Sequence, residues 1–172
     1  MGLFSFWKKK EKPESNTEES PLYLKLKIDL QNKTKANNGT IETYWFENKH
    51  IGLKKTLFHK ILIPLKPFDS GLEHESQPVD TTMIIEWVNL DLSNPYDLDG
   101  ITIQSDKDSD TEASIYIGNV HNPFDILNLT LNKIDERSYR ATGKILIDFE
   151  HEMVANNETF EFTTRIEFKK AE

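Results

Sequence analysis

Hydrophobic and polar residues alternate strictly along much of this chain. In the stretch "LYLKLKIDL", which covers residues 22–30, leucine or isoleucine occupies every second position and polar residues or tyrosine stand between them. Side chains of a β-strand point alternately to its two faces, so a two-residue period is typical of a strand with one buried face. We therefore expect residues 22–30 to form a half-buried strand.

The same period returns twice near the end of the sequence. It is present in "YRATGKILIDF" (residues 139–149) and in "TFEFTTRIEF" (residues 159–168). Short polar links join these stretches to each other and to a third apolar stretch at 126–134, which predicts an antiparallel meander of three strands. Further strands are expected at 40–47, 56–64, 81–90, 101–104 and 113–120.

About nine strands and no well-capped helix predict an all-β fold. Antiparallel strands with one apolar face bury it by stacking two sheets, so an antiparallel β-sandwich is the expected architecture and a β-barrel is the alternative. A second alternative is an α+β fold with one short helix near residues 50–60, where Leu53, Leu57 and Ile61 have helical spacing. The predicted core consists of Leu24, Leu26, Ile28, Ile145, Ile147, Phe149, Phe160, Phe162 and Phe168.

Composition limits the domain organisation. With 172 residues, the chain is expected to contain one sandwich domain over residues 21–172, preceded by a flexible segment over residues 1–20. It contains no cysteine, which rules out disulfides, thiolate metal sites and cysteine nucleophiles. No apolar run reaches 18 residues. We expect a soluble, cytoplasmic protein.

The sequence begins with "MGLFSFWKKK", in which large apolar residues precede a run of lysines. A secretory signal has the opposite order. As a membrane or partner contact the segment would use Leu3, Phe4, Phe6 and Trp7. Burying three such side chains contributes about 1.5–3 kcal/mol each, which the cost of ordering the segment nearly offsets, so any membrane contact is expected to be weak and reversible. The alternative is that the segment folds back onto the domain.

Negative charge is concentrated in the middle of the chain. The protein has a net charge of −8, and residues 69–112 alone contain twelve Asp or Glu and a single Lys. Such a surface repels nucleic acid and attracts a basic protein, whose association it speeds and orients. If the acidic loops gather at one end of the fold, they form one contact surface. The residues predicted to contact the partner are Asp97, Asp99, Asp106, Asp108, Asp110 and Glu112.

Motifs for metal binding and catalysis fail on spacing. The stretch "DKDSDTE" begins like a calcium loop, but Thr111 stands where that loop needs glycine and Ile117 stands where it needs glutamate. Neither a phosphate-binding glycine loop nor a nucleophile motif is present. We therefore predict no catalytic residue, no metal and no cofactor, and a protein that is not an enzyme.

Acidic charge without a catalytic pattern favours a small binding protein that acts through protein–protein interaction. A bacterial immunity protein that neutralises a basic, nuclease-type toxin is one specific case, and it rests on analogy of class alone. One alternative is a peripheral membrane or assembly component that uses the N-terminal segment. Another is a carbohydrate-binding or glycosidase-like sandwich, in which Tyr44, Trp45, Phe46 and Trp87 would stack against sugars.

Overall fold

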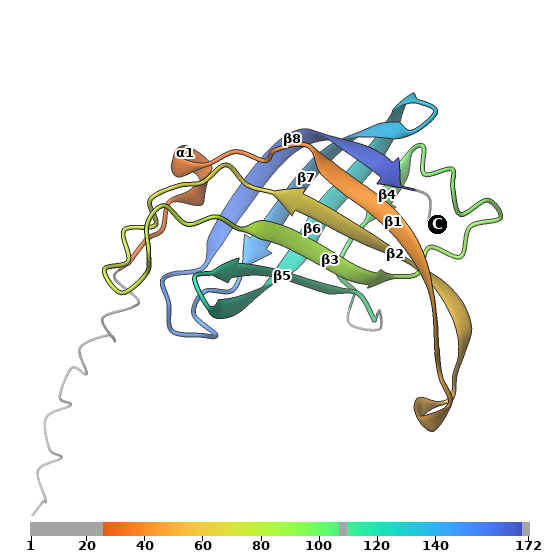
Figure 1. Ribbon diagram of the computed structural model, residues 1–172, viewed down its shortest axis with the longest axis horizontal. Coiled ribbons are helices and arrows are strands. Elements are labelled where there is room, and N and C mark those ends of the chain that lie inside the picture. The colour runs from red at the N-terminus through yellow and green to blue at the C-terminus, as the bar shows by residue number, and fades with distance from the viewer. Residues whose placement is uncertain (1–25, 107–109, 170–172) are drawn as a thin grey trace, which may run out of the picture.

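The computed structural model describes residues 26–106 and 110–169 (Figure 1). Within these ranges the chain forms eight strands, one short helix and one 3-10 turn. In chain order they are α1 (Leu30–Lys33), β1 (Gly39–Asn48), η2 (Lys49–Ile51), β2 (Leu53–Pro64), β3 (Thr82–Val88), β4 (Ile101–Ile103), β5 (Glu112–Ile117), β6 (Val120–Asp135), β7 (Ser138–Ile147) and β8 (Glu158–Lys169). Leu24, Asp108 and the N-terminal residues Leu3, Phe4, Phe6 and Trp7 lie outside the described part.

The all-β prediction is confirmed, but the strands close into a barrel, which was the alternative to the expected sandwich. The sheet has the order β4-β6-β5-β3-β2-β1-β8-β7, and an additional β6–β7 pairing closes seven of these strands into a ring while β4 adds to β6. Closure depends on the 16-residue strand β6, which pairs with β5 and β4 along one edge and with β7 along the other. Two register shifts, near Ile126 and Lys133, accompany the bending that closure requires. The predicted three-strand meander is confirmed as β6–β7–β8.

Alternating side chains fill the barrel. Strand β8 alternates between buried and exposed residues over its whole length, and β7 does so over most of its length. Of the predicted core residues, those that are buried are Ile28, Ile145, Ile147, Phe149, Phe160, Phe162 and Phe168. Leu26 is 39% exposed, so its assignment to the core was wrong.

Residues 26–30 do not form the predicted strand. The carboxylate of Glu158 accepts hydrogen bonds from the backbone N–H groups of Ile28 (2.6 Å), Asp29 (2.8 Å) and Leu30 (3.0 Å). Asp29 has a left-handed backbone (φ 64°), and α1 begins directly after it. The alternation that predicted a strand is therefore broken by one buried carboxylate, which bends the chain into a turn.

This turn covers an edge that the barrel leaves open. Strands β1 and β8 run parallel but pair only between residues 39–42 and 166–169, so the first half of β8 pairs with β7 on one edge and has no strand on the edge that faces β1. The side chain of Gln31 takes the place of a neighbouring strand there, because it accepts from the N–H of Glu161 (2.8 Å) and donates to its carbonyl (3.3 Å). The segment before β1 thereby seals the edge of β8.

The barrel has two distinct ends, seen at the left and right of Figure 1. The left end carries α1 and the loops at 65–81 and 148–157. At the right end the loop at 89–100 is held in place by His59, whose Nε2–H donates to the carbonyl of Pro95 (2.8 Å), and by the Tyr139 hydroxyl, which donates to the carbonyl of Tyr96 (3.1 Å).

The β1–β2 hairpin extends beyond the right end of the barrel (Figure 1). The alternative of a helix near residues 50–60 is wrong: a three-residue 3-10 turn leads through Gly52, at φ 77°, into β2. No helix in the described ranges is long and apolar enough to cross a membrane.

Candidate functional site

The acidic loops of the middle block do not gather at one end of the fold. The loop at 65–81, with Asp69 and Asp80, follows β2, and the loop at 89–100, with Asp97 and Asp99, follows the next strand β3. Because β2 and β3 are antiparallel neighbours, these loops lie at opposite ends of the barrel (Figure 1). A single acidic end therefore does not form.

Asp97 and Asp99 are both engaged with the same residue of β6. The carboxylate of Asp97 lies 3.6 Å from the Lys133 Nζ, and the carboxylate of Asp99 accepts the backbone N–H of Lys133 at 2.7 Å. These two aspartates tie the loop at 89–100 to β6. Two of the six predicted contact residues are thus placed apart from Asp106, Asp110 and Glu112, and each of the two has a partner within the chain.

Asp106 and Glu112 lie together on the outer face of the barrel, where β3, β5 and β6 line a concavity of about 520 Å³. We call it the sheet groove. Glu86 and Asp125 also line it, so the lining includes four carboxylates. The remaining lining consists of Ile84, Ser105, Thr111, Ala113, Ser114, Tyr116, His121, Pro123 and Phe124.

Strand register places two of these carboxylates side by side. Glu86 of β3 is the direct partner of Glu112 of β5, an arrangement of like charges that destabilises a sheet. Lys60 of β2 offsets it with an ion pair to Glu86 at 2.6 Å. The hydrogen bond to Glu86 raises the pKa of Lys60 above its usual value, which keeps the lysine charged.

A second concavity, of about 700 Å³, lies between the β1–β2 hairpin and residues 110–112. We call it the hairpin groove. Its wall carries Asp110, Thr111 and Glu112, and its other lining residues are Phe46, Asn48, Ile51, Gly52, Leu53, Phe58 and Trp87. Because Thr111 and Glu112 line both grooves, the two concavities adjoin.

Aromatic rings pack beneath the hairpin groove. Phe58 is 1% exposed, and its ring centroid lies 5.9 Å from that of Tyr44 and 5.4 Å from that of Trp87. Phe46 meets Trp87 edge-on at 4.7 Å. The Tyr44 hydroxyl accepts the backbone N–H of Trp87 (3.2 Å), and burial raises the pKa of Tyr44.

The sugar-stacking platform considered from the sequence is divided between the two faces of the hairpin. Trp45 is 61% exposed, whereas its neighbours Tyr44 and Phe46 point to the other face and pack in the aromatic cluster. A row of exposed rings does not form from these residues.

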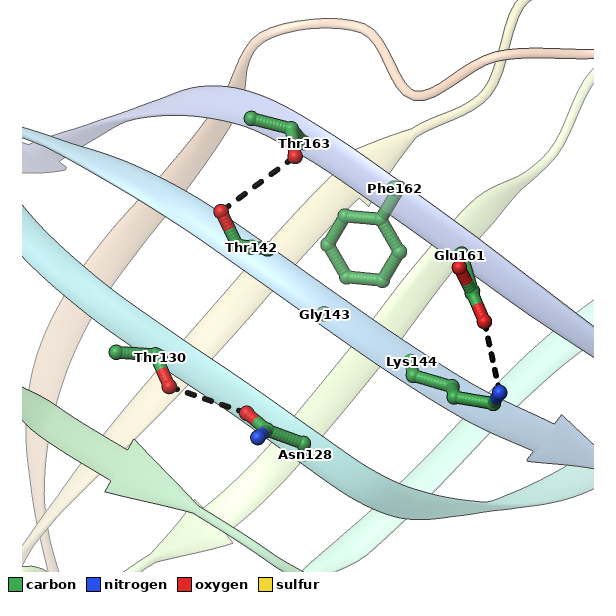
Figure 2. Close-up of a pocket in the computed structure, with 8 residues that line it drawn as sticks. All are labelled: Asn128, Thr130, Thr142, Gly143, Lys144, Glu161, Phe162 and Thr163. Carbon is green, nitrogen blue, oxygen red and sulfur yellow. Dashed lines mark hydrogen bonds and ion pairs between the residues drawn. The ribbon is translucent and has the colours of Figure 1, made fainter.

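A third concavity, of about 480 Å³, lies on the opposite side of the barrel over β6, β7 and β8 (Figure 2). Its polar residues bond to one another: Lys144 to Glu161 at 2.7 Å, Thr142 to Thr163 at 3.4 Å, and Thr130 to Asn128 at 3.1 Å. Since these groups satisfy each other and the charges balance, this surface is a weaker candidate than the sheet groove.

Among the described residues, no group of three or more His, Asp or Glu side chains is arranged to hold a metal ion. Asp110 lines the hairpin groove, while Asp108 lies in the part of the loop that is not described. Glu86 and Asp125 were missed from the sequence because each is an isolated acidic residue at an outward position of a strand. No protein-family model, curated protein or solved structure matches this chain.

Proposed function

We propose that this protein is an acidic binding protein that recognises a basic protein partner through the sheet groove. One observation carries the proposal: Glu86, Asp106, Glu112 and Asp125 line a single concave surface although they come from separate parts of the chain. Among these, Glu86 is paired with Lys60, and Glu112 forms no ion pair with any other residue that the structure describes. The protein performs no chemistry of its own in this proposal.

The groove suits the side chains of lysine and arginine in both their charged and their apolar parts. Carboxylates attract the cationic head, and Ile84, Pro123 and the ring of Tyr116 offer apolar surface to the methylene stem. Charge complementarity of this kind mainly raises the association rate and fixes the orientation of the partner. We expect binding that weakens as salt increases.

An immunity protein that covers the active site of a basic, nuclease-type toxin is the specific form of this proposal. A toxin that binds nucleic acid needs a cationic surface, and an acidic groove on an inhibitor competes for that surface. Both proteins would meet in the cytoplasm. If this form is correct, the gene for this chain lies beside a gene for a basic protein whose nuclease activity the full chain suppresses.

The test neutralises the groove while leaving the fold in place. The variant is Asp106→Asn, Glu112→Gln, Asp125→Asn; it keeps Glu86 because Lys60 depends on it. A matched control removes the same amount of charge from exposed positions elsewhere on the barrel surface and its loops: Glu73→Gln, Glu136→Gln, Glu167→Gln. Wild type and both variants should melt at similar temperatures.

Binding is measured with the neighbouring basic protein, or with a basic protein captured by the full chain from its native cell. The association rate of the groove variant should fall markedly at low salt and much less near 1 M salt, where the Debye length is about 3 Å. The control variant should retain most of the wild-type rate. Equal rates for the two variants, or an affinity that ignores salt, would refute the proposal.

A further inference from the structure

We infer that the hairpin groove is the docking site of the chain's own N-terminal residues 3–10, "LFSFWKKK", and that the segment binds it within the same molecule. This site adjoins the sheet groove that the proposed function uses and shares Thr111 and Glu112 with it. Phe46, Leu53 and Trp87 give the hairpin groove its apolar floor, and none of them lines the sheet groove.

Part of the apolar surface at this groove is not covered by any of the described residues and remains exposed. Ile51, at the tip of the hairpin, is 74% exposed, and Leu53, Phe46 and Trp87 are only partly buried. Contiguous exposed apolar surface on a soluble protein usually marks a contact. Residues Leu3, Phe4, Phe6 and Trp7 supply large apolar side chains of the size that such a groove accommodates.

The order of residues in the segment matches the order of surfaces in the groove. Lysines 8–10 follow Trp7 directly, and the wall carrying Asp110 and Glu112 borders the apolar floor. An aromatic side chain on the floor would therefore place the lysine run beside two carboxylates. The opposite signs of charge favour this segment over an acidic one, because like charges would repel it.

The linker is long enough for the segment to reach the groove of its own barrel. Leu26, the first described residue, is held at the left end by a hydrogen bond from the N–H of Asn156 to its carbonyl (3.0 Å). The residues between Lys8 and Leu26 span up to about 60 Å when extended. A domain of about 140 residues has a radius of gyration of about 14 Å and is roughly 40 Å across. Binding within one molecule thus needs no strain in the linker.

The absence of cysteine allows a direct test. Ser5→Cys creates a single thiol in the full chain, and a nitroxide attached to it broadens NMR signals of nearby nuclei. We expect strong broadening of the amides of Ile51 and Leu53 and of the Trp87 indole. Signals of Thr142 and Lys144, on the opposite side of the barrel, should be unaffected.

Two variants check the chemistry of the contact. Phe4→Ser with Trp7→Ser should abolish the broadening, and Asp110→Asn with Glu112→Gln should reduce it more at low salt than near 1 M salt. Mixing spin-labelled chains with isotope-labelled chains should produce no broadening. Broadening in the mixture would mean a second copy supplies the segment, which would overturn binding within one molecule.

Three further results would also overturn the inference. They are broadening confined to residues near Leu26, broadening spread evenly over the barrel, and no broadening together with binding of the segment to anionic vesicles. Failure here is separable from failure of the proposed function, because Asp106 and Asp125 line the sheet groove and not the hairpin groove. A variant at those two positions should leave the broadening of the Trp87 indole unchanged.

Discussion

Replacing Glu158 with glutamine should destabilise the protein more than any other exchange of a carboxylate for an amide. The side chain is buried, and its two oxygens accept three backbone N–H groups, from Ile28, Asp29 and Leu30. These bonds hold the segment that seals the open edge of β8. A glutamine of the same shape keeps one acceptor oxygen and presents an NH₂ group where the second oxygen was.

The magnitude follows from that geometry. The NH₂ group faces an N–H donor, so at least one buried donor loses its acceptor, and the donors that remain bonded lose the contribution of the charge. Hydrogen bonds to charged groups contribute about 1.5–3 kcal/mol each, and an unsatisfied buried donor costs about 1–3 kcal/mol. We therefore expect a loss of about 2–4 kcal/mol in the free energy of unfolding. For a chain of this size, 1 kcal/mol shifts Tm by about 2–4 °C, so Tm should fall by roughly 4–16 °C.

The matched control is Glu161→Gln, on the same strand. Glu161 is exposed and forms a surface ion pair with Lys144 at 2.7 Å, a kind of contact that contributes about 0–1 kcal/mol. Calorimetric melting compares the two variants, and amide hydrogen exchange reports on Ile28 and Leu30. If Glu158→Gln melts within a degree or so of Glu161→Gln and those amides remain protected, the carboxylate does not anchor the segment and the reasoning fails.

Three shorter predictions concern the barrel wall. Gly143→Ala should lower the free energy of unfolding by about 1–3 kcal/mol, because the new methyl group would lie 2.5 Å from Cζ of Phe162 and force that ring to move. The loss should be smaller in a Phe162→Leu background, and an equal loss there would contradict this cause. Phe162→Ala should cost about 3–5 kcal/mol in urea unfolding, because the side chain is 7% exposed; a loss below about 1 kcal/mol would remove it from the core. The hydrogen-bonded ion pair with Glu86 raises the pKa of Lys60 above its ordinary value of 10.5, so the stabilisation by this pair is complete below that pH and is lost as the pH rises through the raised pKa. Between neutral pH and about pH 11, the Lys60→Met variant should therefore lose less stability than the wild type. An identical pH profile for the two proteins would refute this.

Periodicity was sufficient to locate strands but not to decide how they close. All eight strands overlap a predicted stretch, because the two-residue period is a local property of each strand. A sandwich and a small barrel impose the same alternation. The sequence displays neither the β6–β7 pairing that closes the ring nor the parallel pairing between residues 39–42 and 166–169 that joins β1 to β8 within it. Contacts between the beginning and the end of a chain leave no local signal.

The failure of the strand prediction at residues 26–30 has a similar origin. The pattern is as regular as that of β8, yet within the described part residues 26–30 turn around the Glu158 carboxylate. Glu158 stands more than a hundred residues away and looks like an ordinary polar residue before a strand. Only the structure shows that its carboxylate is buried, at 7% exposure, and accepts the backbone N–H groups that a strand would otherwise pair.

Charge counting located the acidic region but not the acidic surface. Asp97 and Asp99 belong to the same block of sequence as Asp106 and Glu112, but antiparallel strands and the pairing with Lys133 separate them. Asp125 lies outside the block and joins the groove because β6 pairs with β5. Membership of a surface depends on register, which the number of charges in a stretch does not contain.

The stagger of β1 against β8 links the barrel to the hairpin groove. Since only the first four residues of β1 pair with β8, the remainder of β1 and the facing part of β2 extend past the barrel end. Aromatic residues on that overhang cannot reach the barrel core, so Phe58 is buried instead against Tyr44 and Trp87 on the outer face. The backbone of Trp87 is left-handed (φ 58°), and the β2–β3 register shifts beside it, which brings its ring over the hairpin. The aromatic floor therefore comes to lie beside Asp110 and Glu112 as a consequence of how the strands of the barrel are staggered, and Phe58 is buried apart from the residues that fill the barrel.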